Sequence, residues 1–229
     1  STRSWQTRTV LSGEDGSPEN PATPIATGLF PSVTELNGVL YIAAYDGLSG
    51  QLILVSGTAG GILDSTVLVS GETRSGIAGA GDVGAHVVIA PTSDGHLGLA
   101  WIDGVAGTVA YGRINPRAGD DQLTLMSAPE IVALGRQDTP PRLIGADLTL
   151  AYRGNGDPLI AYQDQTNGNL LLATRGNAGW TQTVVSQIGV SGFSPVLFVE
   201  PEGTWIVHGV LRSEQSTISE RVDVRAVPF

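Results

Sequence analysis

Three aspartates recur at matching places in the sequence, and they are the first candidates for chemistry. Asp46, Asp103 and Asp164 each end an apolar stretch, and each precedes a glycine by four residues. A ring of such carboxylates would bind a cation or the hydroxyl groups of a sugar. Alternatively, an aspartate at a strand end accepts backbone N–H bonds in the following turn. We favour this structural interpretation, because catalytic groups usually occur once per protein and these occur once per repeat.

The three histidines of the chain, His86, His96 and His208, add no further motif. No two of them have the close spacing of a zinc site. A Gly-x-Ser-x-Gly motif in a strand–turn–helix setting, which would present a nucleophilic serine, is also missing. Glycoside hydrolysis needs two carboxylates about 5–10 Å apart, and the sequence does not reveal such a separation.

The composition excludes several classes of function. A formal net charge of −10 argues against a binder of duplex nucleic acid and against docking on anionic lipid. The chain has no cysteine, so it has no disulfide, thiolate metal site or cysteine nucleophile. All 12 basic residues are arginine, which excludes Schiff-base chemistry and a Walker-type lysine. No apolar run reaches about 18 residues, so we expect no membrane insertion.

The three aspartates belong to a repeat that organises the chain. Each lies eight residues after a turn glycine and three residues after an alanine; the glycines are Gly38, Gly95 and Gly156, and the alanines are Ala43, Ala100 and Ala161. The copies are 57 and 61 residues apart, which is typical of a four-stranded propeller blade. Alignment of a fourth copy on Gly203 places His208 in the alanine column and Leu211 in the aspartate column. A shift of one residue places Gly209 and Arg212 there instead, and the acid is lost in both cases.

Each copy contains the signals of four short strands. Asn-Gly or Asp-Gly turns join its first two strands, and helical periodicity is almost absent. The sequence therefore predicts an all-β fold, a single four-bladed β-propeller over residues 1–229. The expected blades cover residues 28–71, 82–135, 141–188 and 192–229. Residues 4–12 resemble an outer strand and would complete the fourth blade, which closes the ring. A β-sandwich and part of a larger propeller are the alternatives.

Packing near a propeller axis explains the alanine column, because converging strands leave room only for small side chains. His208 would then be the one large polar group of this inner layer. Tryptophans fall about once per blade, and they either fill gaps between blades or stack against sugars. The residues that we consider for ligand binding are His208, Arg212, Trp101, Trp205 and Tyr162.

The repeat resembles the blades of secreted bacterial β-propellers, and more distantly the Asp-box families of sialidases and lectins. The resemblance rests on an apolar strand that ends in an aromatic residue, any residue and aspartate, followed by a glycine turn, as in Tyr162–Asp164. Thr92-Ser93-Asp94-Gly95, with Trp101 further on, departs from the Asp-box spacing. A sialidase would need three converging arginines, which the loop residues Arg74, Arg117, Arg136 and Arg153 do not establish.

Together these observations predict a non-catalytic module, secreted or in the cell envelope. It would bind a protein partner or a glycan through loops on one propeller face, since such loops carry function on rigid scaffolds. The long loops are residues 13–28, 71–84, 115–124 and 135–141. A lectin-like propeller is the second interpretation, and a glycoside hydrolase or lyase with an axial site is the third. We expect no cofactor. Calcium is the alternative, although the acidic segment 13–27 lacks the ligand spacing of a calcium loop.

Overall fold

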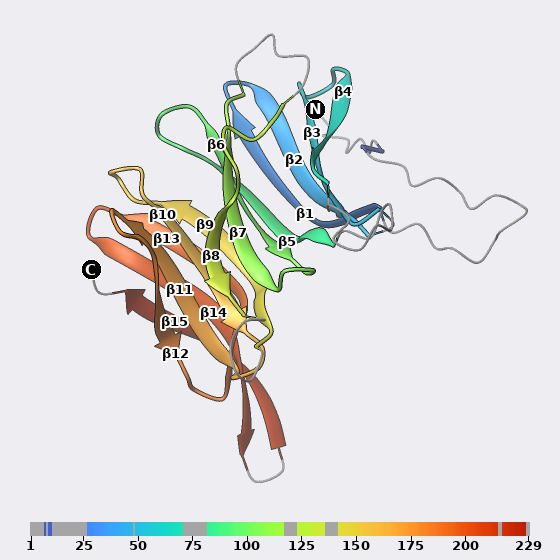
Figure 1. Cartoon of the computed structure of the whole chain (residues 1–229). Helices are drawn as coiled ribbons and strands as arrows, with labels where there is room; N and C mark the ends of the chain where they lie inside the picture. Colours follow the sequence, from blue (N-terminus) through green and yellow to red (C-terminus); the bar gives the residue numbers. More distant parts are fainter. Residues whose placement is uncertain are drawn as a thin grey trace, which may run out of the picture.

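The structure is a computed structural model that describes residues 27–47, 49–70, 82–116, 123–135, 142–214 and 217–227, together with Thr7, Thr9 and Val10. Within these residues the chain forms strands, turns and loops, and no helix. The strands make four separate antiparallel sheets, each built from strands that follow one another in the chain (Figure 1). The predicted all-β fold is confirmed. The two-sheet sandwich is excluded, because the sheets number four.

Three of the sheets have four strands and the last has three. The first contains β1 (Thr27–Leu36), β2 (Val39–Asp46), β3 (Gln51–Gly57) and β4 (Leu63–Val69). The second contains β5 (Val83–Pro91), β6 (Leu97–Asp103), β7 (Thr108–Ile114) and β8 (Glu130–Leu134). The third contains β9 (Ile144–Tyr152), β10 (Pro158–Asp164), β11 (Asn169–Gly176) and β12 (Gly179–Ser186). The fourth contains β13 (Val190–Glu200), β14 (Gly203–Glu214) and β15 (Thr217–Val227).

The aspartates and glycines of the repeat build the turn between the second and third strands. The glycines four residues after each aspartate, Gly50, Gly107 and Gly168, have φ of 64–66°, the left-handed conformation that glycine adopts without strain. The aspartate side chains brace the same turns. Asp103 Oδ1 accepts the backbone N–H of Ala106 at 2.7 Å, and Asp164 Oδ1 accepts that of Asn167 at 3.1 Å. Asp46 accepts the hydroxyl hydrogen of Ser49.

The core lies between the sheets rather than within one barrel. Three clusters of buried apolar side chains separate the first sheet from the second, the second from the third and the third from the fourth. All seven residues of β10 are buried, as expected for a blade strand covered on both faces. The alanines of the repeat have no exposed surface, so they act as close-packing positions.

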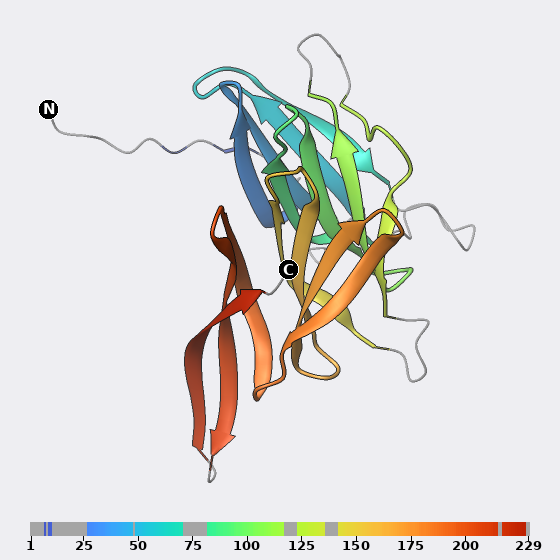
Figure 2. The same ribbon diagram turned by 90° about the vertical axis from the view of Figure 1, so that its left-hand side faces the viewer.

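The first strand of each sheet contacts the sheet before it. β5 contacts β1, β2 and β3, and β9 and β13 repeat these contacts one and two sheets further along. Successive sheets therefore stack face to face while their first strands converge, which is the arrangement of propeller blades. Figure 2 shows the resulting fan, from β1–β4 at one end to β13–β15 at the other.

The strand pairing corrects the predicted alignment of the fourth repeat. Ala43, Ala100 and Ala161 pair with the first-strand residues Ser32, Val88 and Thr149, and the matching pair in the fourth sheet is Val196 with Val207. Val207 therefore occupies the alanine column. Val210 occupies the aspartate column, where we had expected Leu211 or Arg212. The alignment on Gly203 was wrong by one residue and the shifted alignment by two, because the fourth hairpin turns at residues 201–202 and Gly203 already belongs to β14.

Closure of the ring by residues 4–12 stays a prediction. Only Thr7, Thr9 and Val10 of that segment are described, and none of the three lies in a strand. The fourth sheet ends at β15 in the described part of the chain. The described residues do not test the predicted domain boundaries or the blade count. Most of the four long loops lie outside the described residues.

Candidate functional site

Every first strand carries a bulge at the same place. In β1 the pairing register slips between Leu29 and Ser32, and β5, β9 and β13 slip at the corresponding positions. Each bulge holds a residue other than glycine with a φ of 44–52°; the four are Phe30, His86, Asp147 and Ser194. Such backbone costs about 1–3 kcal/mol at each position and occurs preferentially at ligand and catalytic sites.

A glycine two residues before each bulge residue explains why the bulges form. These are Gly28, Gly84, Gly145 and Gly192, with φ of 82–115°. A Cβ atom on Gly84 would lie 2.9 Å from Leu52 Cβ in the preceding sheet, and one on Gly145 would lie 2.8 Å from Val109 Cγ2. On Gly192 it would lie 3.3 Å from Gln163 Cβ. In β5, β9 and β13 the backbone of the first strand therefore lies directly against the preceding sheet, and the bulge follows. Gly28 in β1 has nothing within 4 Å of its Cβ position.

The four bulges meet around one hollow, which we call the axial hollow. It has a volume of about 310 Å³ and is lined by all four bulge residues. The remaining lining residues are apolar: Pro31, Val87, Val88, Leu148, Pro195 and Val196. Asp147 is the one carboxylate among these lining residues.

Neighbouring bulge residues contact one another around the axis. The ring of Phe30 stacks on that of His86, with centroids 4.1 Å apart and planes inclined by 25°. The backbone N–H of Asp147 donates to His86 Nδ1 at 3.2 Å, and the backbone N–H of Ser194 donates to Asp147 Oδ2 at 3.0 Å. The separation of His86 Nδ1 from Asp147 Oδ1 is 3.7 Å. The carboxylate of Asp147 is therefore held by one hydrogen bond from the next sheet.

Burial sets the charge state of the histidine. It lowers the pKa of His86, and the nearby Asp147 carboxylate opposes that shift only in part. His86 is therefore neutral at pH 7. Because its Nδ1 accepts the Asp147 N–H, the proton of the neutral ring lies on Nε2, which is a hydrogen-bond donor.

This combination suits a sugar better than an apolar or cationic ligand. The Phe30 side chain belongs to a residue that is 42% exposed, so part of its ring is available for stacking on a pyranose or furanose face. Asp147 can accept hydrogen bonds from hydroxyl groups or exchange a proton with water. A hollow with apolar walls and a few convergent polar groups is the usual form of a small-ligand site.

The predicted binding residues do not line the axial hollow. Trp101, Tyr162 and His208 are at most 1% exposed and lie within the packing of the blades. Trp205 is 44% exposed on β14, and Arg212, on the same strand, is partly exposed. Their role in binding stays a prediction. The sequence reasoning missed the four bulge residues of the axial hollow. A signal for them was present: a glycine stands two residues before each bulge, and 15 or 16 residues before the alanine-column residue of the second strand.

His208 has a structural partner that the sequence did not indicate. Its Nδ1 accepts the backbone N–H of Gly192 at 3.2 Å, and Gly192 precedes the bulge at Ser194. In the strand pairing, His208 occupies the position that Trp101 and Tyr162 occupy in the second and third sheets, one residue after the alanine column. It therefore supports the fourth bulge from behind rather than lining the inner layer.

The described residues contain no group of three or more histidine, aspartate or glutamate side chains that could hold a metal ion. The expectation that the protein needs no cofactor stays a prediction. A search of the same residues for a helix long and apolar enough to cross a membrane also found none.

Sequence comparison identifies no relative. No protein-family model matches the chain, and no curated protein sequence matches it.

Comparison with solved structures is informative. An α-L-arabinofuranosidase from Podospora anserina, in complex with cellotriose, matches 94% of this chain and 68% of its own at 14% identity, with a TM-score of 0.58. The fold is that of a β-propeller. A GH43 β-1,3-galactosidase matches 81% of this chain and 69% of its own at 11% identity, with a TM-score of 0.55. An exo-β-1,3-galactanase from Phanerochaete chrysosporium, with β-1,3-galactotriose, matches 81% of this chain at 9% identity, with a TM-score of 0.54. This propeller spans only 44% of that galactanase.

These structures correct the functional expectation. We expected a non-catalytic interaction module, but the β-propellers that the chain is similar to are glycoside hydrolases. Our third interpretation, a glycoside hydrolase or lyase with an axial site, agrees with these structures. At 9–14% identity the similarity establishes the fold alone, so the chemistry has to be argued from the axial hollow.

Proposed function

We propose that this protein acts on carbohydrates and hydrolyses a glycosidic bond at the axial hollow. The observation that carries the proposal is the position of Asp147. It is the carboxylate of the hollow, it occupies one of four strained bulge positions, and Ser194 fixes its orientation. The solved β-propellers act on galactosides and arabinofuranosides, so we propose neutral glycosides of this kind as substrates.

In this proposal Asp147 acts as the base that activates water beside the anomeric carbon. For this role its Oδ2 accepts the Ser194 N–H, which holds the carboxylate in one orientation in the hollow. His86 positions the substrate: its Nε2–H donates to a sugar hydroxyl, and its ring supports Phe30. Phe30 provides the apolar surface on which the sugar ring stacks.

Most glycoside hydrolases also use a carboxylic acid that protonates the leaving group. The residues that line the axial hollow include Asp147 and no second carboxylate. The proposed base should therefore be detected most readily with substrates whose leaving group departs without protonation. 4-Nitrophenyl glycosides have this property, because 4-nitrophenolate is a stable anion near neutral pH.

The test is a kinetic comparison on 4-nitrophenyl β-galactopyranoside and 4-nitrophenyl α-L-arabinofuranoside. The protein should release 4-nitrophenolate from at least one of them, and Asp147→Asn should reduce kcat/KM by a factor of about 100 or more. Asp64→Asn is the matched control, since Asp64 is exposed on β4 and does not line the axial hollow, and it should leave kcat/KM unchanged. Equal turnover by the Asp147→Asn variant would contradict the assignment. Binding of the glycosides without any turnover would contradict hydrolysis.

We also propose a secreted or cell-envelope location, where polysaccharide substrates are accessible. We also keep the four-bladed ring in which residues 4–12 pair with the edge of β15. This arrangement is supported by the three-stranded fourth sheet, whose described edge has no neighbour, and closure would protect that edge.

A further inference from the structure

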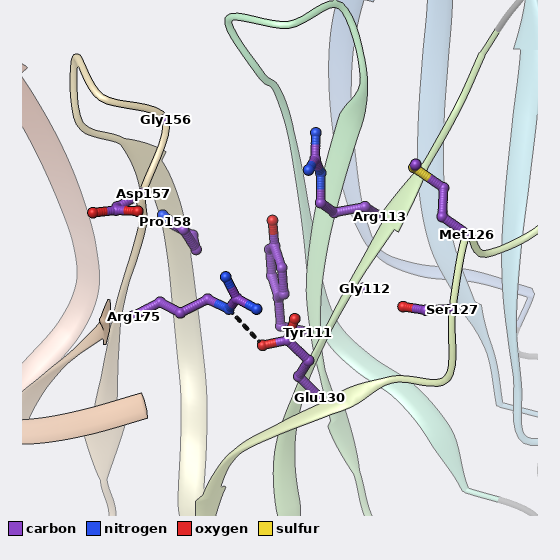
Figure 3. A pocket seen from close by; sticks show the side chains of 10 residues that line it. All are labelled: Tyr111, Gly112, Arg113, Met126, Ser127, Glu130, Gly156, Asp157, Pro158 and Arg175. Carbon is purple, nitrogen blue, oxygen red and sulfur yellow. Dashed lines mark hydrogen bonds and ion pairs between the residues drawn. The ribbon is translucent and has the colours of Figure 1, made fainter. Parts of the chain in front are cut away.

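A second hollow lies between the second and third sheets, and we call it the lateral hollow. It has a volume of about 310 Å³, and its charged and aromatic lining residues are Tyr111, Arg113, Glu130, Asp157 and Arg175 (Figure 3). It is formed at the β9–β10 hairpin, whereas Asp147 lies near the start of β9. The five residue-to-residue steps from Asp147 to Tyr152 alone span about 17 Å, so the lateral hollow is distinct from the axial one.

Two arginines enter the lateral hollow, and each is anchored by a carboxylate. Arg175 Nε donates to Glu130 Oε2 at 2.7 Å, and the same oxygen accepts Trp180 Nε1–H at 2.9 Å. Arg113 Nη2 donates to both oxygens of Asp94, at 2.8 and 2.6 Å. Figure 3 shows the two guanidinium groups on either side of the Tyr111 ring. These anchors fix the positions of the two side chains.

The anchoring neutralises charge but leaves hydrogen-bonding capacity unused. The two terminal nitrogens of Arg175 make no hydrogen bond with any described residue, and Arg113 Nε is buried without a partner. Glu130 uses only Oε2 within the described structure, so Oε1 remains an acceptor. The Arg175 side chain is 45% exposed, so a ligand oxygen can reach its terminal nitrogens.

The balance of charge decides the class of ligand. Each guanidinium already faces one carboxylate, Asp157 adds a further negative charge, and the chain as a whole has a net charge of −10. An anion therefore gains little here. A hydroxyl-rich neutral molecule both accepts from the arginines and donates to Glu130 and Asp157. The volume is at the lower end of the range for ligand pockets, which suits one sugar ring.

We propose that the lateral hollow is a second binding site, for a single neutral sugar ring held by Arg113, Glu130 and Arg175. It does not depend on hydrolysis at the axial hollow. Because the two hollows are separate, a saccharide in the lateral hollow leaves the axial one free.

The test is isothermal titration calorimetry with methyl β-D-galactopyranoside, methyl α-L-arabinofuranoside and sodium galacturonate, performed on the Asp147→Asn variant so that no substrate is consumed. A neutral glycoside should bind, and galacturonate should bind more weakly. Arg175→Gln and Arg113→Gln should each raise the Kd about tenfold or more, because each removes charge-assisted donors. Arg221→Gln, at an exposed position of β15, is the matched control and should change the Kd less than twofold.

A second variant keeps the test decisive if the arginine substitutions unfold the protein. Ser127 is an exposed residue that lines the lateral hollow, so Ser127→Phe fills the space without touching either ion pair. It should abolish the binding that the two arginine substitutions weaken. The proposal is overturned if galacturonate binds more tightly than the neutral glycosides, if no glycoside binds, or if Ser127→Phe leaves the Kd unchanged. Loss of 4-nitrophenyl glycoside turnover with retained lateral binding would instead refute only the axial proposal.

Discussion

Replacing Gly145 with alanine tests whether packing between blades creates the bulge that presents Asp147. Gly145 has a φ of +97°, a backbone conformation that alanine adopts only with strain. Its added Cβ would lie 2.8 Å from Val109 Cγ2 and 3.0 Å from Ile102 Cγ1, both in the second sheet. The substitution therefore combines a strained backbone with a steric clash against a packed core.

The expected loss of stability follows from these two contributions. The backbone contribution is about 1 kcal/mol, and overpacking of a core typically adds about 1–3 kcal/mol. Gly145→Ala should therefore lower the free energy of unfolding by about 2–4 kcal/mol. Gly28 separates the two effects, because it has a φ of +82° and nothing within 4 Å of its Cβ position. Gly28→Ala should lower the free energy of unfolding by only the backbone contribution, about 1 kcal/mol.

Equilibrium urea unfolding of the variants measures these differences. Gly154→Ala is the control, since Gly154 has no positive φ and nothing within 4 Å of its Cβ position, and it should stay within about 0.5 kcal/mol of the parent protein. Gly145→Ala should also reduce glycoside hydrolysis, because it displaces the proposed base, Asp147, which lies two positions further along the chain. If all three variants unfold at the same urea concentration, the packing explanation of the bulges is refuted.

Three further predictions concern other parts of the chain. His208→Phe removes the acceptor of the Gly192 N–H and should lower the free energy of unfolding by about 1–3 kcal/mol; unchanged chemical denaturation would show that this bond contributes nothing. Burial lowers the folded-state pKa of His86 below its unfolded value, so the unfolded chain binds more protons and stability should fall as the pH drops below about 6.5. Thermal unfolding of His86→Gln should be less sensitive to pH between 5 and 7 than that of the parent, and an identical pH dependence would contradict the shift. Deletion of residues 1–12 should lower the thermal midpoint if they complete the fourth sheet, whereas an unchanged midpoint would argue against a closed ring.

The strand order of the molecule was predictable from short-range signals. Asn37-Gly38 illustrates why: both residues have positive φ, 54° and 81°, as the favoured hairpin turn requires. The turn and the flanking alternation of apolar residues identify the hairpin without any distant contact. The same signals failed in the fourth copy because its turn at residues 201–202 contains no glycine, so Gly203 was taken as the turn residue.

The axial hollow was not predictable in the same way. Its four residues, Phe30, His86, Asp147 and Ser194, share a backbone conformation but no side-chain type, so no repeated letter marks them. The last three bulges involve contacts with the preceding sheet, such as that of Gly145 with Val109, 36 positions earlier. The aspartates that do repeat braced turns instead. Side chains that differ between copies at a shared backbone position were therefore the better indication of a site.

The most direct test of the central claim is the position of a bound saccharide in a crystal structure. We expect β-1,3-galactotriose or an arabinofuranoside, soaked into crystals of the Asp147→Asn variant, to stack one ring on Phe30 and to place its anomeric carbon beside position 147. A second ring in the lateral hollow would agree with both proposals. A saccharide bound only away from the bulges, with the axial hollow empty at saturating concentration, would contradict an active site at the axis.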